Sequence, residues 1–160
     1  MTSPECRGSG SSQPIHCAVD RDIADRYWGA RSRTAYAWQS LRRAGARLVF
    51  GSDAPVETPD VFQGLYAAVT RRRPENPEGP SWYPEEALPL HEALRAYTEM
   101  PAYAAGAETF MGRLREGYLA DFVALEGDPL AGPPEALLRA SVAATVVGGT
   151  VVYAAPNFAG

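Results

Sequence analysis

Cysteine, histidine and long apolar runs are scarce in this 160-residue chain, and each scarcity excludes a class of protein. The two cysteines, Cys6 and Cys17, match neither a disulfide framework nor the ligand spacing of a zinc finger. No apolar run approaches the roughly 20 residues that span a bilayer, and the amino terminus lacks the apolar region of a signal peptide. The sequence therefore predicts a soluble, cytoplasmic protein with reduced thiols and no membrane partner.

Positive charge is also in short supply, since the net charge is −4 at pH 7. A net negative charge does not attract the phosphates of a nucleic acid, so we expect no nucleic-acid partner. The basic run 71–73 is the exception. It follows a segment with helical periodicity, and we interpret it as a solvated helix end, in preference to a phosphate site.

The chain does contain an alternation of helical and extended patterns. Residues 1–12 are rich in Gly and Ser without periodicity, which predicts a disordered or aberrant amino terminus. "QPIHCAV" (13–19) is interpreted as a short extended segment, because Pro14 favours extended geometry at Gln13. Helices are predicted over 32–44, 59–73, 91–99 and 101–105, a strand over 47–50, and a loop over 74–89.

The carboxyl-terminal part changes in character. "GYLADFVAL" and "VAATVVGGTVVYAA" are apolar or β-branched runs, and Gly148-Gly149 predicts a two-residue hairpin turn. In the first half, strands alternating with helices indicate parallel βα units and an α/β fold class. Two such units are too few to close a doubly wound sheet or a barrel.

Asp53 is the first candidate for chemistry, because it directly follows an apolar strand within "GSDAPVE". In parallel βα architectures, reactive groups lie at the carboxyl ends of strands, where the loops converge. A carboxylate there can bind a divalent metal and take a proton from water. It can equally cap the following turn through backbone amides. Position alone leaves both interpretations open.

His16 lies at the end of the predicted extended segment, so its imidazole and the Asp53 carboxylate could meet at one rim. A lone histidine is also commonly a hydrogen-bonded structural residue. Cys17 would point to the opposite face of a strand and so would not act together with His16. His91 begins a predicted helix and is expected to be solvated. Asp121 is interpreted as a structural carboxylate held by the amides of the preceding "REGY" turn.

Six motifs occur in a fixed order along the chain. They are "QPIH" (13–16), "GSDAPVE" (51–57), "GLYAAVTRR" (64–72), "EALRAYT" (92–98), "MGRLREGYLADFVALEGDPL" (111–130) and "TVVGGTVVY" (145–153). With these motifs the chain resembles the carboxyl-terminal part of the metal-dependent amidohydrolases. The resemblance is to the branch similar to N-substituted formamide deformylases, called amidohydrolase family 3.

The resemblance implies the last two βα units of a (β/α)₈ TIM-like barrel over 13–110, carboxyl-terminal strands of a small β-sandwich over 111–155, and a tail over 156–160. Asp53 would bind the catalytic divalent metal, usually zinc, and pass a proton from the attacking water to the leaving amine. His16 is carried over as a pocket or metal-ligand residue. The implied reaction is hydrolysis of amide-type, non-peptide C–N bonds in small molecules.

The chain departs from this family in its length and its histidines. Full-length relatives are several times longer and begin with a His-x-His pair, whereas this chain has two histidines and no such pair. Catalytic zinc usually takes three protein ligands, so Asp53 with His16 falls short. The residues before "QPIH" also lack the expected apolar strand. These departures predict a truncated or frame-shifted chain that is inactive alone.

Three hypotheses therefore stay open. The first is an amidohydrolase that cleaves C–N bonds with metal-activated water. The second is a non-catalytic remnant or interaction fragment, which would self-associate through exposed barrel edges. The third is complementation, in which a separate polypeptide supplies the other barrel strands.

Overall fold

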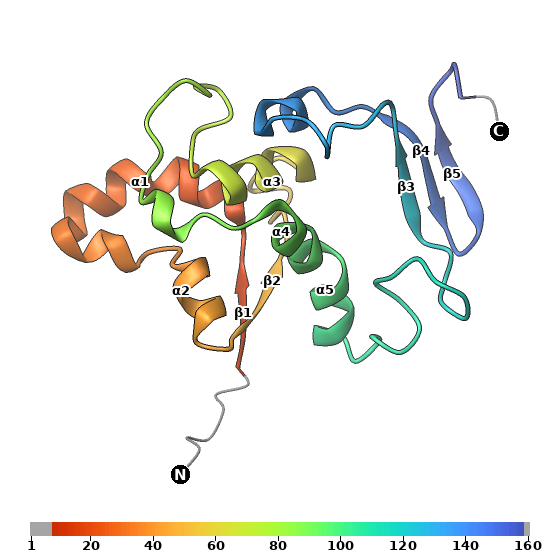
Figure 1. The fold of residues 1–160 in the computed structure, drawn as a ribbon, viewed down its shortest axis with the longest axis horizontal. Coiled ribbons are helices and arrows are strands. Elements are labelled where there is room, and N and C mark those ends of the chain that lie inside the picture. Colours follow the sequence, from red (N-terminus) through yellow and green to blue (C-terminus); the bar gives the residue numbers. More distant parts are fainter. Residues whose placement is uncertain (1–7, 159–160) are drawn as a thin grey trace, which may run out of the picture.

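The computed structural model describes residues 8–158, with a small sheet among helices and a second sheet at the far end of the molecule (Figure 1). The helices are α1 (Pro14–Trp28), α2 (Trp38–Arg43), α3 (Val61–Thr70), α4 (Leu90–Tyr97) and α5 (Glu99–Ala104). The strands are β1 (Ser9–Ser12), β2 (Arg47–Phe50), β3 (Phe122–Leu125), β4 (Val142–Val147) and β5 (Thr150–Ala154). Short 3₁₀ segments cover Gly29–Thr34, Pro84–Glu86 and Pro134–Arg139.

The first sheet is a parallel pair, as the sequence predicted for this half of the chain. Ser9 of β1 lies opposite Arg47 of β2, and Ser12 lies opposite Phe50. The two strands are joined through α1 and α2, because a parallel pair requires a long crossover connection. A mixed α/β architecture is thus confirmed, whereas a barrel stays a prediction.

The amino-terminal elements differ from the sequence-based prediction. Disorder was predicted for 1–12; residues 1–7 lie outside the described part, but Ser9–Ser12 forms β1. It forms because its backbone groups pair with β2, a contribution that amino-acid composition does not record. The predicted extended segment after Gln13 is also wrong. Gln13 is extended, but Pro14 begins α1, since proline suits the first helical position, where its missing N–H costs nothing.

The single helix predicted over 32–44 is interrupted. The 3₁₀ segment ends at Thr34 and α2 begins at Trp38, while Tyr36 between them adopts a left-handed φ of 53°. Two contacts hold Tyr36 in this conformation. Its hydroxyl donates to Asp20, and its carbonyl accepts a hydrogen bond of 2.7 Å from Arg71 Nη1. Tertiary contacts therefore override a local helical pattern.

The core lies between β2 and the surrounding helices. Phe50 packs edge-on against Trp38 of α2 and Tyr97 of α4, with ring centroids 5.5 Å apart in both pairs. Leu48 and Phe50 are both buried, consistent with one face of β2 packing on the helices. The other buried members of this core include Leu65, Tyr66, Trp82, Leu88 and Leu137.

Arg71 corrects the expectation of a solvated helix end at 71–73. The side chain is 1% exposed, and its guanidinium lies 4.8 Å from the Trp38 ring and 5.3 Å from the Trp82 ring. Arg71 Nε donates a hydrogen bond of 2.8 Å to the Trp82 carbonyl. Burial lowers the pKa of the guanidinium. Stacking on two aromatic faces and bonds to carbonyls offset that desolvation, as arginine's planar group allows.

The second sheet is antiparallel, in the order β3-β4-β5. The predicted hairpin is confirmed, since Gly148 and Gly149 join β4 to β5 with φ of 56° and 78°. Asp121 accepts a hydrogen bond of 2.6 Å from Gly148 N. Its structural role is confirmed, although its partner is the hairpin tip rather than the "REGY" turn. Within residues 8–158, none of the helices combines the length and the apolar character that crossing a membrane requires.

Candidate functional site

The structure brings His16 and Asp53 together at one edge of the parallel sheet. Asp53 follows the end of β2, and His16 lies in the first turn of α1, just after the end of β1. The carboxyl ends of parallel strands share an edge, which explains their proximity. His16 Nε2 lies 3.4 Å from Asp53 Oδ2. The predicted meeting of the two side chains is confirmed, although His16 projects from a helix rather than a strand end.

Asp53 closes the turn after β2 through its backbone, not its side chain. The residue adopts a left-handed φ of 61°, which aspartate tolerates better than most residues. Its carbonyl accepts hydrogen bonds from Val56 N at 2.9 Å and Glu57 N at 3.4 Å. Among the described residues, no backbone amide donates to its carboxylate. The capping interpretation therefore does not hold, and the carboxylate stays available for a site.

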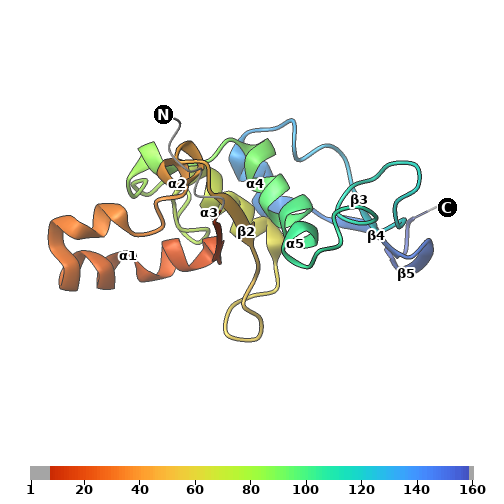
Figure 2. The ribbon, with the colours of Figure 1, turned by 90° about the horizontal axis from the view of Figure 1, so that it is seen from below.

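Glu57 is a third member of this cluster, which the sequence analysis missed. Its Oε1 lies 4.0 Å from His16 Nε2, and its side chain is 24% exposed. Glu57 belongs to the loop between β2 and α3 that projects from the body of the molecule in Figure 2. Glu57 ends the motif "GSDAPVE", and this position was the sequence signal available for it. The motif does not show that the chain turns back at Asp53, so it does not by itself place Glu57 beside His16.

His16 Nε2 is a buried polar atom without a hydrogen-bond partner in the described residues. Buried nitrogen atoms of this kind are uncommon, because an unmade hydrogen bond costs free energy on burial. The two carboxylates nearby approach within ion-pair distance but do not satisfy hydrogen-bond geometry. The imidazole and its neighbours thus form a polar cluster with unused bonding capacity.

The cluster fits part of a metal site and not a whole one. An imidazole nitrogen and a carboxylate are the donors that zinc accepts. Within residues 8–158, however, no group of three or more His, Cys, Asp or Glu side chains is arranged to hold a metal ion. Because catalytic zinc usually takes three protein ligands, His16 and Asp53 would supply at most part of the set.

Cys17 and His91 do not join the site. Cys17 is buried, and burial raises the pKa of its thiol to about 11, which suppresses the reactive thiolate. The prediction that Cys17 faces away from His16 assumed that both residues lie on a strand, whereas both lie on α1. Burial of Cys17 is what keeps it out of the site. His91 has a side chain 74% exposed, so its predicted solvation is confirmed.

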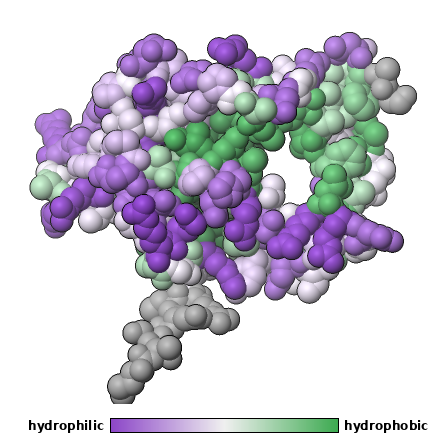
Figure 3. All heavy atoms as spheres, viewed as in Figure 1, coloured by the Kyte–Doolittle hydropathy of each residue, from purple (hydrophilic) through white to green (hydrophobic). Residues whose placement is uncertain are grey.

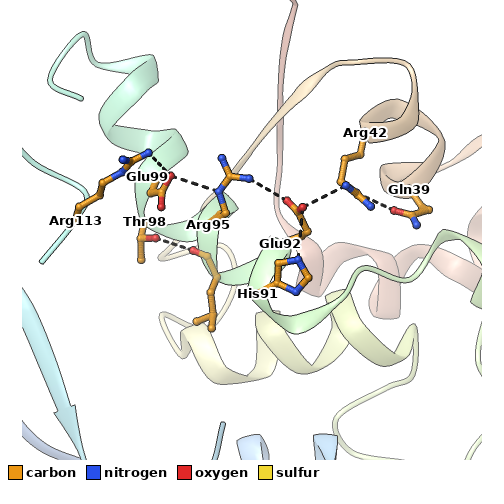
Figure 4. A network of polar contacts seen from close by, with 9 residues as sticks. Gln39, Arg42, His91, Glu92, Arg95, Thr98, Glu99 and Arg113 are labelled. Carbon is orange, nitrogen blue, oxygen red and sulfur yellow. Dashed lines mark hydrogen bonds and ion pairs between the residues drawn. The ribbon is translucent and has the colours of Figure 1, made fainter. Parts of the chain in front are cut away.

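A second polar cluster lies on α4 and α5 (Figure 4). Glu92 contacts Arg42 at 3.2 Å and Arg95 at 3.4 Å. Glu99 contacts Arg95 at 3.4 Å and Arg113 at 2.9 Å. These partly exposed ion pairs link α2, α4, α5 and the segment after α5, and each contributes roughly 0–1 kcal/mol.

A cavity of about 280 Å³ adjoins this second cluster and is lined by Arg47, Arg95, Tyr103 and Arg113 among others. Arg47 begins β2, whereas Asp53 follows its other end. The cavity therefore lies away from His16 and Asp53. In parallel βα folds, the amino ends of strands serve stability and the carboxyl ends serve chemistry. We accordingly assign the candidate site to the Asp53 end.

Comparison with known proteins places the chain among hydrolases. Residues 4–153 match the model of the amidohydrolase family. The chain is 40% identical over 142 residues to YtcJ of Bacillus subtilis (strain 168), whose name describes it as an amidohydrolase. It is 33% identical over 115 residues to the N-substituted formamide deformylase of Arthrobacter pascens. These matches cover 88% and 72% of this chain.

Solved structures agree at the level of the fold. A crystal structure of a Xaa-Pro dipeptidase with bound methionine matches with a TM-score of 0.58 and 16% identity, over 89% of this chain and 34% of the dipeptidase. An uncharacterised protein matches with a TM-score of 0.55 and 18% identity, over 91% of this chain and 35% of its own length. The described α/β arrangement thus corresponds to part of a larger structure in each.

The chain also corresponds to only part of its curated relatives. The match covers 27% of YtcJ and 21% of the formamide deformylase. It covers 24% of the protein LONG AFTER FAR-RED 3 of Arabidopsis thaliana, which is 34% identical over 145 residues. The six sequence motifs, the family match and these relatives agree, and the chain belongs to the amidohydrolase family, in the branch called amidohydrolase family 3.

Proposed function

We propose that this chain is the Asp53-bearing part of a metal-dependent amidohydrolase that hydrolyses amide-type, non-peptide C–N bonds of small molecules. The observation that carries the proposal is the 3.4 Å approach of Asp53 Oδ2 to His16 Nε2 where β1 and β2 end. The β1–β2 pair would be the last two strands of a (β/α)₈ barrel, and β3–β5 would belong to a small β-sandwich.

Asp53 has two roles in this proposal. Its carboxylate would hold a divalent metal, with zinc the expected ion, and a bound zinc supplies Lewis-acid activation of water. The same carboxylate accepts a proton from the attacking water and returns it to the leaving amine, as general acid–base catalysis requires. His16 lies beside it and would serve as a further metal ligand or a contact to the substrate.

Catalysis requires more of the protein than residues 8–158 provide. These residues offer no set of three metal-binding side chains, and the chain covers only 27% of YtcJ and 24% of LONG AFTER FAR-RED 3. We therefore expect no hydrolysis by the chain alone. The missing ligands would come from other barrel strands, in the same polypeptide or in a separate one.

The test is a chimera in which this chain replaces the matching quarter of YtcJ. We expect the chimera to retain zinc and to hydrolyse an N-substituted formamide, the substrate class named for one relative. Asp53→Asn should lower the rate at least about 100-fold and reduce the zinc content, since removal of an electrostatic stabiliser commonly has that effect. Asp22→Asn, a surface carboxylate that pairs with Arg73, is the matched control.

An Asp53→Asn chimera that keeps both its zinc and its full activity would contradict the proposal. A well-folded chimera that neither binds zinc nor hydrolyses any amide would instead support an interaction fragment. That second function is favoured by the apolar side chains exposed on β5, among them Val151 and Val152.

A further inference from the structure

We propose that the cavity at the amino end of β2 binds the phosphate group of a small phosphomonoester. Three arginines, Arg47, Arg95 and Arg113, line this cavity of about 280 Å³. It lies at the end of β2 opposite to Asp53, and the hydrolysis assigned to Asp53 uses no phosphate. The inference therefore goes beyond the proposed function and does not depend on it.

The three arginines come from three separate segments of the chain. Arg47 begins β2, Arg95 lies on α4, and Arg113 follows α5. Glu99 of α5 lies between two of them, 3.4 Å from Arg95 and 2.9 Å from Arg113 (Figure 4). Guanidinium groups that reach one space from three segments can surround the oxygens of a tetrahedral group, whereas a planar carboxylate is bound by forks that share its plane. The arrangement therefore favours a phosphate.

Arg47 is the arginine that anchors the site. Its guanidinium lies 4.0 Å from the centroid of the Tyr103 ring. Within residues 8–158, no carboxylate lies within ion-pair distance of this guanidinium. Stacking on a ring occupies the flat face of the group and leaves its N–H edge available for paired bonds to an oxyanion. The fork of Arg47 is thus oriented while its donors stay available.

The other two arginines also keep donors for a ligand. Glu99 accepts hydrogen bonds from Arg95 Nε and Arg113 Nη2, and Glu92 accepts one from Arg95 Nη1. In the described part of the chain, Arg95 Nη2 and Arg113 Nε and Nη1 have no acceptor. Since a guanidinium carries five N–H donors, the bonds to glutamate orient these groups without using them up.

The charge of the cavity has the sign that an anion requires. Its charged lining consists of the three arginines and two glutamates, Glu99 and Glu108, which leaves one positive charge in excess. The chain as a whole has a net charge of −4. A positive cavity on a negative protein attracts an anion locally, where the rest of the surface repels it.

The remaining lining fits a small organic group attached to the phosphate. Met100 and Met111 line the cavity together with Tyr103 and Tyr118. The Tyr118 hydroxyl donates a hydrogen bond of 2.8 Å to the Glu108 carbonyl, which fixes that wall. The volume is just below the roughly 300–1,000 Å³ typical of small-molecule sites, so the ligand must be small. Apolar contacts beside a charged anchor therefore indicate a phosphomonoester.

The experiment titrates the full ¹⁵N-labelled chain with inorganic phosphate and, separately, with phenyl phosphate. Sodium chloride holds the ionic strength constant, and backbone amide shifts report binding. We expect saturable shifts around Arg47, Arg95 and Arg113. The amides of His16 and Asp53 should stay constant. Phenyl phosphate should bind at least about fivefold more tightly than inorganic phosphate, because its ring is partly buried against the tyrosines and methionines.

Substitutions separate a built site from a general effect of charge. Arg47→Gln should weaken phenyl phosphate binding at least about tenfold, and Arg47→Lys at least about threefold, because lysine keeps the charge but lacks the fork. Arg43→Gln is the matched control, since it removes one positive charge from an exposed residue outside the cavity and should change affinity less than about twofold. Arg113→Gln, on the segment after α5, covers the case in which the Arg47 variants unfold.

Three outcomes would overturn the inference. The first is amide shifts no larger with phosphate than with chloride at the same ionic strength. The second is equal weakening by Arg47→Gln and Arg43→Gln, which would reduce binding to net charge. The third is phenyl phosphate that binds no more tightly than inorganic phosphate, which would remove the organic group from the ligand. Zinc binding and hydrolysis by the chimera are measured separately, so failure here leaves the proposed function untouched.

Discussion

Arg71 carries a cation into the interior of the helical part of the molecule. Its stability there depends on two tryptophan faces and two backbone carbonyls, those of Tyr36 and Trp82. The bond to the Tyr36 carbonyl holds that residue in its left-handed conformation, and the bond to the Trp82 carbonyl fixes the loop after α3. One side chain thereby joins three segments that are distant in the sequence.

We predict that Arg71→Lys destabilises the chain by roughly 2–4 kcal/mol, although the charge is retained. A lysine ammonium has neither the flat surface to stack between Trp38 and Trp82 nor the fork that reaches both carbonyls, so buried acceptors lose their partners. Urea-induced unfolding followed by tryptophan fluorescence measures the change.

The neighbouring Arg72→Lys is the control for this prediction. Arg72 is partly exposed and lies 3.9 Å from Glu135, so its exchange should cost less than about 1 kcal/mol. Equal destabilisation by the two substitutions would show that burial between the tryptophans contributes nothing specific.

The packing of α3 on α4 depends on Gly64. A Cβ at this position would collide with the hydroxyl of Tyr97 and lie 3.1 Å from its Cζ. Alanine is otherwise about 1 kcal/mol better than glycine inside a helix. The close approach of the two helices therefore outweighs local helix propensity at this position.

We predict that Gly64→Ala lowers the free energy of unfolding by about 1–3 kcal/mol, since overpacking displaces Tyr97 and the helix that carries it. Tyr97→Phe removes the clashing hydroxyl, so the double variant should recover part of the loss. Thermal unfolding of the four chains gives the coupling energy. A Gly64→Ala chain more stable than the native one would contradict the packing argument.

Elements with strong local signals were predictable from the sequence. The strand over 47–50, the Gly148-Gly149 hairpin and most of the helix predicted over 59–73 occur, because apolar periodicity and paired glycines are local features. That helix spans Val61–Thr70 and ends at Arg71, before the proline expected to stop it. β1 and the break at Tyr36 were not predictable in this way. Both depend on partners far along the chain, namely β2 and Arg71.

The candidate site was predictable to the same extent. Asp53 and His16 could be brought together in advance, because the ends of parallel strands share an edge. Glu57 could not, since its position depends on the left-handed conformation of Asp53, and aspartate does not require it. The division of the chain into barrel and sandwich parts stays a prediction.

The molecule as a whole leaves one end poorly covered. Figure 3 shows apolar residues on the exposed surface of the second sheet and open space between that sheet and the helical part. On β5, Val151, Val152 and Tyr153 are each at least half exposed. Successive residues of a strand face opposite sides, so both faces of this edge strand carry apolar groups.

We predict that the isolated chain self-associates through β5. An exposed, apolar edge strand can pair with a strand of another molecule, and a lysine on the edge disfavours such pairing because its charge would have to be buried. Val151→Lys and Val152→Lys should each shift the chain toward the monomer, as measured by light scattering after gel filtration from micromolar to millimolar concentration. Thr150→Lys, at the start of the strand, should have a smaller effect. A native chain that is monomeric throughout this range would refute the prediction.

The strand β1 has a consequence for how this family diverges. Its ladder with β2 uses backbone atoms, and a Cβ added at Gly10 would meet nothing within 4 Å. Within residues 8–158, only Ser12 of this strand has a side-chain hydrogen bond, which its Oγ accepts from Trp38 Nε1 at 3.2 Å. Purifying selection on the side chains of Ser9–Ser11 should therefore be weak. Genetic drift can erase the sequence signature of this strand while its place in the sheet persists.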